Sequence, residues 1–328
     1  MSYDFILLIA ISFTTTFFMT PHIINYLRNI KLQVKDVHKQ GEPSVPRSGG
    51  IAVLTGIIAS LFLLVFINVF VKQTTQDIIY LLAAIITLTL ITFIGFFDDL
   101  RIRIDSRGEG GLKQWQKPLL SLPAAIPLMA VVAGTTIIAL PFLGKVNFGL
   151  LYPLILVPVV VVGAANMVNM LEGLNGLSTG MGLVYTSSLG LFTYYHHEYI
   201  AAAIAFAVFG SLLAFWKFHK TPAKILAGDS LTYLLGATIA VIAIIGNVEK
   251  AALIISIPFF IELILKLRGG LKKTTIGRVN ENGKLESKYD KIYSLPHIWM
   301  RTGRFTEKQI VFYLILMELF FSVLIWVV

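Results

Sequence analysis

The sequence contains no cysteine and few charged residues, which make up only 14% of its 328 positions. The lack of cysteine excludes disulfide bonds, a thiolate nucleophile, and iron–sulfur or cysteine-ligated zinc sites. Soluble domains carry roughly 25% charged residues, so this chain lacks the polar surface that a water-soluble protein requires. It also shows no internal repeat, although many transporters have related halves with interrupted helices in matching positions.

The sequence consists mostly of long hydrophobic runs. Hydrophobic residues make up 56% of the sequence, and the mean hydropathy is +0.79. Because a transmembrane helix needs about 20 apolar residues, the runs predict about ten such helices and leave no room for a second, soluble domain. We therefore predict an all-α integral membrane protein with a single transmembrane domain over 1–328. The predicted spans are 5–26, 50–71, 78–97, 118–133, 153–165, 178–195, 200–216, 230–246, 251–265 and 309–328.

Two segments depart from a simple succession of spans. The fifth predicted span, 153–165, is only about 20 Å long at 1.5 Å per residue. It cannot cross a hydrocarbon core of about 30 Å alone, so we expect it to end inside a cavity of the protein. The long polar segment 268–308 is expected to be a small appendage. Its turn 280–283 separates two candidate strands, 274–279 and 284–289, which predicts a β-hairpin.

The 27 Lys and Arg residues lie almost entirely in alternate loops. The odd-numbered loops between the predicted spans hold 5, 5, 0, 3 and 11 of them, whereas the even-numbered loops hold 1, 1, 0 and 1. By the positive-inside rule, the odd-numbered loops should face the cytoplasm and both termini the outside. Topology and attraction to anionic lipid headgroups account for most of the net charge of +9, so no nucleic-acid partner is expected.

The recognisable polar motifs also fall in the odd-numbered loops, which predicts chemistry at the cytoplasmic face. Asp98 and Asp99 end the third span, where adjacent carboxylates suit a hydrated Mg²⁺ or a phosphate site. Alternatively they mark the membrane boundary, with Arg101 and Arg103 as counter-charges. The motifs are 45–50, 98–99, 166–176, 227–230 and 295–301.

The fifth and seventh loops hold further acids and amides. Asn166, Asn169 and Glu172 are spaced three residues apart, which puts them roughly on one face of a helix. Such a cluster at a membrane helix is costly without a ligand, although the segment could simply be a turn that caps the fifth span. Asp229 precedes the eighth span, where it could cap the helix or lie beside a bound phosphate.

Basic residues offer counter-charges for phosphate. Arg47 and Lys117 begin the second and fourth spans, where each could also be a membrane anchor. Glu318 lies near the middle of the last span and is a functional candidate by its position, without an assigned role. The last-loop residues that could together clamp a pyrophosphate are Lys272, Lys273, Arg278 and Arg301.

Taken together, the ordered motifs over about 43–301 resemble the polyprenyl-phosphate N-acetylhexosamine-1-phosphate transferases, a ten-span membrane enzyme family. Segments 114–129 and 282–286 are similar to its archaeal and eukaryotic branch. That branch transfers GlcNAc-1-phosphate from UDP-GlcNAc to dolichyl phosphate and releases UMP. The resemblance therefore implies these two substrates and Mg²⁺, or Mn²⁺, held by Asn169 and Asp229.

The resemblance also implies roles for individual residues. Lys117 would hold phosphate oxygens, and Asp98 and Asp99 would orient the acceptor or its counter-charges. Gly173 and Asn175 would shape the uridine site. The implied catalytic residues are Asp98, Asp99, Lys117, Asn169 and Asp229; the implied substrate-binding residues are Arg47, Gly173, Asn175, Lys273, Arg278, His297 and Arg301.

Three departures from the family pattern leave alternatives open. Glu172 stands where bacterial members usually carry Asp, and the stretch 101–116 separates Lys117 from the aspartate pair. Residues 273–275 are Lys-Thr-Thr, where the eukaryotic enzyme is richer in Arg and His. The donor could therefore be another UDP-N-acetylhexosamine or the acceptor undecaprenyl phosphate; a multi-span transporter is the alternative from another class. We expect a plasma membrane location in a prokaryote or the endoplasmic reticulum in a eukaryote, and allow for a homodimer.

Overall fold

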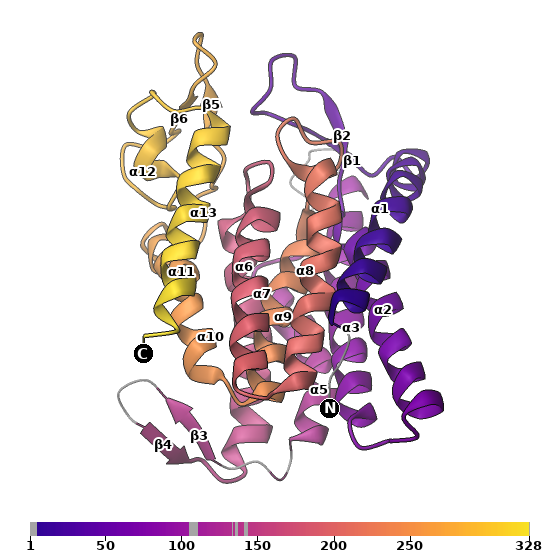
Figure 1. Cartoon of the computed structure of the whole chain (residues 1–328). Helices are drawn as coiled ribbons and strands as arrows, with labels where there is room; N and C mark the ends of the chain where they lie inside the picture. The colour runs from indigo at the N-terminus through magenta and orange to yellow at the C-terminus, as the bar shows by residue number, and fades with distance from the viewer. Residues whose placement is uncertain (1–4, 105–110, 133, 135–136, 141–143, 328) are drawn as a thin grey trace.

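The computed structural model describes residues 5–104, 111–132, 134, 137–140 and 144–327, which form a helical bundle with three two-stranded hairpins (Figure 1). The helices are α1 (Phe5–Asn29), α2 (Gly50–Phe66), η1 (Ile67–Val71), α3 (Ile78–Ile104), α4 (Gln116–Ser121), η2 (Leu122–Ala125), α5 (Ile126–Val131), η3 (Tyr152–Leu156), α6 (Val157–Leu171), α7 (Leu177–Tyr195), α8 (Tyr199–His219), α9 (Gly228–Gly246), α10 (Glu249–Ile255), α11 (Ile257–Arg268), α12 (His297–Met300) and α13 (Glu307–Leu324). The strands are β1 (Gln33–Lys35), β2 (Ser44–Pro46), β3 (Ile137–Leu140), β4 (Gly144–Asn147), β5 (Arg278–Val279) and β6 (Leu285–Glu286).

The all-α membrane architecture is confirmed. Six helices in the described part of the chain are long and apolar enough to cross a membrane. The other predicted spans are helical too, but α10 and α11 divide one of them, and α4, η2 and α5 divide another. A total of ten crossings therefore stays a prediction, and positions 133 and 328 at the ends of two predicted spans lie outside the described residues. The six helices are Phe5–Asn29, Gly50–Val71, Ile78–Arg101, Tyr152–Leu171, Tyr199–His219 and Gly228–Gly246.

The prediction of a short fifth span is wrong. The helix runs without a gap from Tyr152 to Leu171, 20 residues, which is about the length that a membrane crossing needs. Asn166 lies inside this helix. Its polar side chain is accommodated there because the amide group donates to the carbonyl oxygen of Val162 in the preceding turn at 2.8 Å. Polar side chains that face other protein groups can thus lie inside a membrane helix.

The helix α9 lies at the centre of the bundle, and 94% of its most hydrophobic 18-residue stretch is buried. It packs against α2, α3, α6 and α8. The approach of α3 is close, because a Cβ atom added at Gly95 would lie 2.4 Å from the carbonyl oxygen of Asp229. Glycine at this position therefore lets the acidic end of α3 reach the first turn of α9.

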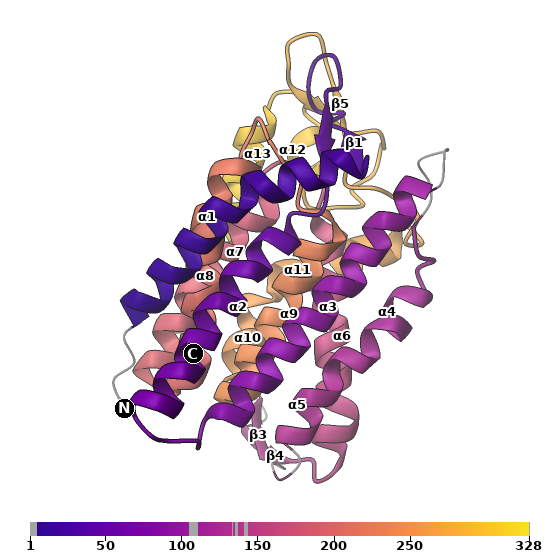
Figure 2. The same ribbon diagram turned by 90° about the vertical axis from the view of Figure 1, so that its right-hand side faces the viewer.

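The hairpins lie at opposite ends of the bundle. Figures 1 and 2 show β1–β2 and β5–β6 at one end and β3–β4 at the other. The predicted last-loop hairpin is confirmed but is shorter, with Arg278–Val279 paired to Leu285–Glu286. The turn is held by the side-chain oxygen of Asn280, which accepts from the backbone N–H of Asn282 and Lys284. The hairpins β1–β2 and β3–β4 were not expected from the sequence.

This arrangement makes the predicted orientation testable. Single cysteines that replace the exposed Glu42 and Asn282 should share one accessibility class in sealed vesicles, and a cysteine at the exposed Lys145 should show the other. The reason is the charge asymmetry of the loops. The measurement is labelling with a membrane-impermeant maleimide, for which the cysteine-free chain is its own control. Labelling of Glu42→Cys and Asn282→Cys from different sides would contradict the orientation.

Candidate active site

Asp99 of α3 caps the N-terminus of α9 from a neighbouring helix. Its carboxylate accepts from the backbone N–H of Asp229 at 2.9 Å and of Ser230 at 3.3 Å. These N–H groups have no partner inside the helix, and the positive end of the helix dipole favours an anion there. Gly228 makes room, because an added Cβ would lie 2.4 Å from Asp99 Oδ2. Asp229 itself does not cap the helix, so that alternative is wrong.

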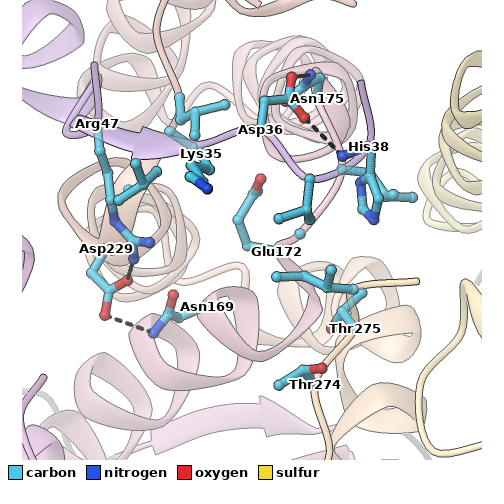
Figure 3. A pocket seen from close by; sticks show the side chains of 18 of the residues that line it. Lys35, Asp36, His38, Arg47, Asn169, Glu172, Asn175, Asp229, Thr274 and Thr275 are labelled. Atoms are coloured by element: carbon cyan, nitrogen blue, oxygen red, sulfur yellow. Dashed lines mark hydrogen bonds and ion pairs between the residues drawn. The ribbon is translucent and has the colours of Figure 1, made fainter. Parts of the chain in front are cut away.

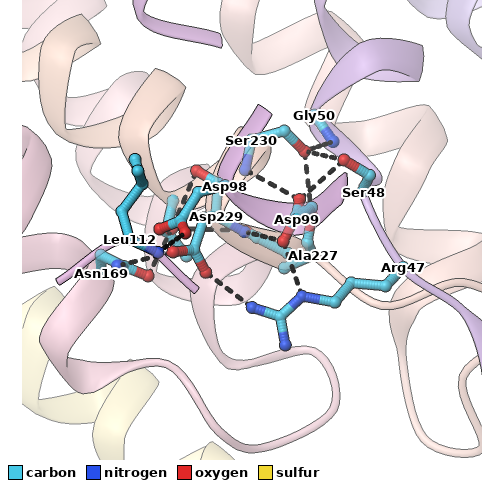
Figure 4. A network of polar contacts seen from close by, with 12 residues as sticks. Arg47, Ser48, Gly50, Asp98, Asp99, Leu112, Asn169, Ala227, Asp229 and Ser230 are labelled. Atoms are coloured by element: carbon cyan, nitrogen blue, oxygen red, sulfur yellow. Dashed lines mark hydrogen bonds and ion pairs between the residues drawn. The ribbon is translucent and has the colours of Figure 1, made fainter. Parts of the chain in front are cut away.

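Arg47 joins the two helices through their carboxylates, as Figure 4 shows. Its Nε lies 2.6 Å from Asp99 Oδ1, and its Nη2 lies 2.6 Å from Asp229 Oδ1. The neighbouring Ser48 hydroxyl lies 2.7 Å from Asp99 Oδ2 and 2.9 Å from the Ser230 hydroxyl. The loop before α2 thus supplies a charge and a hydroxyl that fix both carboxylates.

Lys117 bridges Asp98 and the second carboxylate oxygen of Asp229, as Arg47 bridges Asp99 and the first. Its Nζ lies 2.6 Å from Asp98 Oδ2 and 2.7 Å from Asp229 Oδ2. Asp98 also accepts from the backbone N–H of Leu112 at 2.6 Å. The cationic partners of the aspartate pair are therefore Arg47 and Lys117, which come from other loops. The ammonium group of Lys117 thus lies between the carboxylates of Asp98 and Asp229, and both hold it by charge-assisted hydrogen bonds.

Asn169 of α6 completes the network. Its amide group lies 3.3 Å from Asp229 Oδ2, and its Oδ1 accepts from the Thr232 hydroxyl at 2.9 Å. Asp98, Asp99 and Asp229 carry three negative charges against two positive charges on Arg47 and Lys117. Carboxylate and amide oxygens are the donors that Mg²⁺ prefers, so the residues present fit that ion. No group of three or more His, Asp or Glu within the described ranges has the spacing of a ready metal centre.

A cavity of about 330 Å³ opens beside this network (Figure 3). Five of the predicted site residues line it together. Gly173 adopts φ +155°, and an added Cβ would lie 3.1 Å from the Thr275 side chain, so a larger residue would narrow the cavity. We call it the first cavity. The predicted residues that line it are Arg47, Asn169, Gly173, Asn175 and Asp229.

Glu172 lines the same cavity, and its Oε2 is buried without a hydrogen-bond partner among the described residues. Burial raises the pKa of Glu172 to about 7, against the opposite effect of hydrogen bonds with Ser178 and the Gly173 backbone. An unfolded Glu titrates near 4.3. Between about pH 4.3 and pH 7, Glu172 is therefore protonated in the folded protein but ionised in the unfolded chain. The stability that comes from the uncharged carboxyl is complete below about pH 4.3 and is lost as pH rises through about 7.

The variant Glu172→Gln is expected to escape this loss. Its Tm should exceed that of the parent protein by more at about pH 8 than at about pH 5, because only the parent gains a buried charge. Thermal unfolding in detergent at both pH values measures the difference. Glu281→Gln, at an exposed position, is the control. Equal differences at the two pH values would contradict the raised pKa.

A second cavity of about 530 Å³ shares Asn169 with the first. Lys117 and Lys273 line it, and Asn169, Met170 and Lys266 line both cavities. A third cavity of about 410 Å³ is lined almost wholly by apolar residues. Along α6, Val160, Gly163 and Met167 of the third cavity and Met170 of the second are spaced three or four residues apart. The second and third cavities therefore follow one face of that helix.

The remaining predicted residues lie elsewhere. Arg278 and Arg301 are exposed and are absent from the described lining of the first and second cavities. His297 is fully buried, its Nδ1 accepts from the Tyr293 N–H at 3.3 Å, and burial lowers its pKa to about 4. A neutral imidazole is a weak phosphate ligand. The substrate-binding roles of these three residues stay predictions.

Several site residues were missed by sequence reasoning. Ser48 and Ser230 lie inside quoted motifs, and their hydroxyls could have been considered as partners of the acids. Lys266 forms an ion pair with Glu262, four residues earlier in α11, at 3.4 Å. It also donates to the Thr275 hydroxyl at 2.8 Å and so holds the last loop against α11. Asp36 and His38, which line the first cavity, gave no sequence signal.

Comparison with known proteins agrees with this geometry. The family model described as glycosyl transferase family 4 matches residues 80–247. A Saccharolobus solfataricus protein, provisionally named UDP-N-acetylglucosamine–dolichyl-phosphate N-acetylglucosaminephosphotransferase, is 37% identical over 96% of this chain and 94% of its own. A Sulfolobus acidocaldarius protein with the same provisional name is 31% identical over 97% and 94% of the two chains.

A bacterial relative extends the comparison. A phospho-N-acetylmuramoyl-pentapeptide-transferase of Clostridium perfringens is 29% identical over 79% of this chain and 81% of its own. The segment that the family model matches contains Asp98, Asp99, Lys117, Asn169 and Asp229, which form the polar network around the first turn of α9. The resemblance predicted from the ordered motifs is thereby confirmed, and the chain belongs to glycosyl transferase family 4.

Proposed function

We propose that the protein transfers GlcNAc-1-phosphate from UDP-GlcNAc to dolichyl or another polyprenyl phosphate and releases UMP. The observation that carries the proposal is the meeting of two cavities at Asn169 and Lys266, beside Lys117 and Asp229. The first cavity is polar and suits a nucleotide sugar. The second continues along α6 toward the apolar third cavity, which suits a lipid with a charged head and a long apolar chain.

The chemistry follows from the charges at this junction. An oxygen of the acceptor phosphate would attack the sugar-bearing phosphorus, and the bond from that phosphorus to the UMP oxygen would break. Lys117 and Arg47 lie where they can hold phosphate oxygens, and Asp98 and Asp99 hold these two cations in place. A phosphate monoester with a second pKa near ~6 is mostly dianionic at neutral pH. A general base is therefore not required, and we favour direct attack over an aspartyl-phosphate intermediate.

A divalent cation is part of the proposal. Asn169 and Asp229 would hold Mg²⁺, or Mn²⁺, because their oxygens suit a hard cation. The bound ion would neutralise the pyrophosphate and the charge that develops on the leaving group. We place the site at the cytoplasmic face because the loops that form it carry most of the positive charge. In a prokaryotic cell this membrane would be the plasma membrane. A homodimer stays a prediction.

UMP release by the purified full chain tests the proposal. A panel of radiolabelled UDP-sugars is combined with dolichyl or undecaprenyl phosphate, with and without Mg²⁺. We expect release only when UDP-GlcNAc, a polyprenyl phosphate and Mg²⁺ are all present. Preference for another UDP-N-acetylhexosamine would support the second candidate within the family. Sugar phosphate trapped on the protein with donor alone would defeat direct attack, and movement of substrate without UMP release would favour a transporter.

A further inference from the structure

Glu307, the first residue of α13, connects segments that are far apart in the sequence. Its carboxylate is buried, with 5% of the side chain exposed. It accepts from the backbone N–H of Asn175 at 2.9 Å and from the Thr221 hydroxyl at 3.2 Å, and it forms an ion pair with Lys39. Asn175 lines the first cavity, whereas Glu307 is not among the residues that line it. Any effect of Glu307 on a ligand must therefore act through its partners.

His38 extends the connection to the last loop. The backbone N–H of Gly277 donates to His38 Nε2 at 3.2 Å, so that nitrogen carries a lone pair. A neutral ring then has its hydrogen on Nδ1, which lies 3.4 Å from Glu307 Oε1. Glu307 thus stabilises the tautomer that accepts from Gly277. Thr275 and Ile276, directly before Gly277, line the first cavity.

Asp36, which lines the first cavity, connects Asn175 to His38 (Figure 3). Its Oδ2 accepts from Asn175 Nδ2 at 2.6 Å, and its Oδ1 accepts from the backbone N–H of His38 at 3.2 Å. Asn175 is therefore held at two points, by Glu307 through its backbone and by Asp36 through its side chain. Three walls of the first cavity, 36–38, 172–175 and 274–276, are joined through Glu307 and its partners.

We propose that Glu307 is a positioning residue that sets the affinity of the first cavity for a uridine nucleotide. The inference rests on the proposed function, whose donor it takes as the ligand. A cavity whose walls are already joined loses less conformational freedom when the ligand binds. Removal of the connection should therefore weaken nucleotide binding and leave the phosphoryl transfer step, which occurs at the separate network around Asp229, nearly unchanged.

The variant Glu307→Gln tests this role in the purified full chain. We expect the Kd for UMP and the KM for UDP-GlcNAc to rise about tenfold, with kcat and the KM for polyprenyl phosphate within about twofold of the parent values. Glu281→Gln, exposed in the β5–β6 turn, is the matched control. Calorimetric titration with UMP and steady-state kinetics measure the split. An unchanged Kd, or a fall in kcat at unchanged KM, would overturn the proposal.

A second variant covers the case in which Glu307→Gln fails to fold. His38→Asn removes the link to Gly277 but leaves the contact between Glu307 and Asn175, so the Kd for UMP should rise by only about threefold. Hydrogen exchange of the backbone amide at 277 should accelerate in His38→Asn, whereas exchange at 175, whose N–H still donates to Glu307, should stay slow, with or without enzyme activity. If the parent protein does not bind UMP, the proposed function fails. If the parent and every variant bind UMP equally well, only the positioning role fails.

Discussion

Replacement of Asp229 by Asn is expected to lower turnover by roughly a thousandfold. Asp229 is the carboxylate that both Arg47 and Lys117 contact, and it is also a proposed Mg²⁺ ligand. Asn keeps the volume of the side chain but removes the charge that holds the two cations. The loss of several kcal/mol of transition-state stabilisation corresponds to about three powers of ten in rate. UMP release per folded molecule is the measurement.

A matched substitution separates this effect from general damage. Asp290→Asn makes the same chemical change at an exposed position of the last loop and should leave turnover unchanged. Asn169→Ala should show a loss comparable to that of Asp229→Asn, because the two residues share the proposed ion. Near-normal turnover in both Asn169→Ala and Asp229→Asn would remove the basis for the metal assignment.

The second large effect is expected on stability, where Asp98 and Asp99 should differ. Asp99→Asn should lower the free energy of unfolding by about 3 kcal/mol. Its carboxylate is fully buried and serves Arg47, Ser48 and two N–H groups of α9. In the Asn variant, the NH₂ group would replace one of the two accepting oxygens and would face an N–H or O–H group that also donates. Asp98 is equally buried but accepts from one N–H group, and its cation Lys117 keeps Asp229 as a partner. Asp98→Asn should therefore reduce stability by less, about 1 kcal/mol.

Both variants should lose rate and keep UDP-GlcNAc binding. Asp98 would act on the rate through Lys117, and Asp99 through the orientation of Arg47 and Asp229. Thermal unfolding in detergent and UMP release together distinguish the two roles, with Asp290→Asn again as the control. Equal losses of stability in the two variants would contradict the capping role of Asp99. A collapse of donor affinity in both would instead assign the pair to the nucleotide site.

The sequence by itself determined the membrane architecture and the family. Hydrophobic runs predict helices because backbone groups in a bilayer must bond within their own segment, and this constraint acts locally. The same is true of the turn 280–283, whose side-chain bonds reach only a few residues. The ordered motifs also identified Asp98, Asp99, Lys117, Asn169 and Asp229, because each belongs to a short recognisable pattern.

The partners of these residues were decided only by tertiary structure. Arg47 meets Asp99 across 52 positions and Asp229 across 182, separations at which local sequence carries no signal. The cap of α9 comes from α3, and this is possible because Gly95 and Gly228 allow the two helices to approach. The full length of the fifth span depends partly on the same kind of contact, because Asn169 finds its partners Asp229 and Thr232 on α9. Glu307 and His38 entered the site in this way too, since their contacts arise only when distant loops fold onto one end of the bundle.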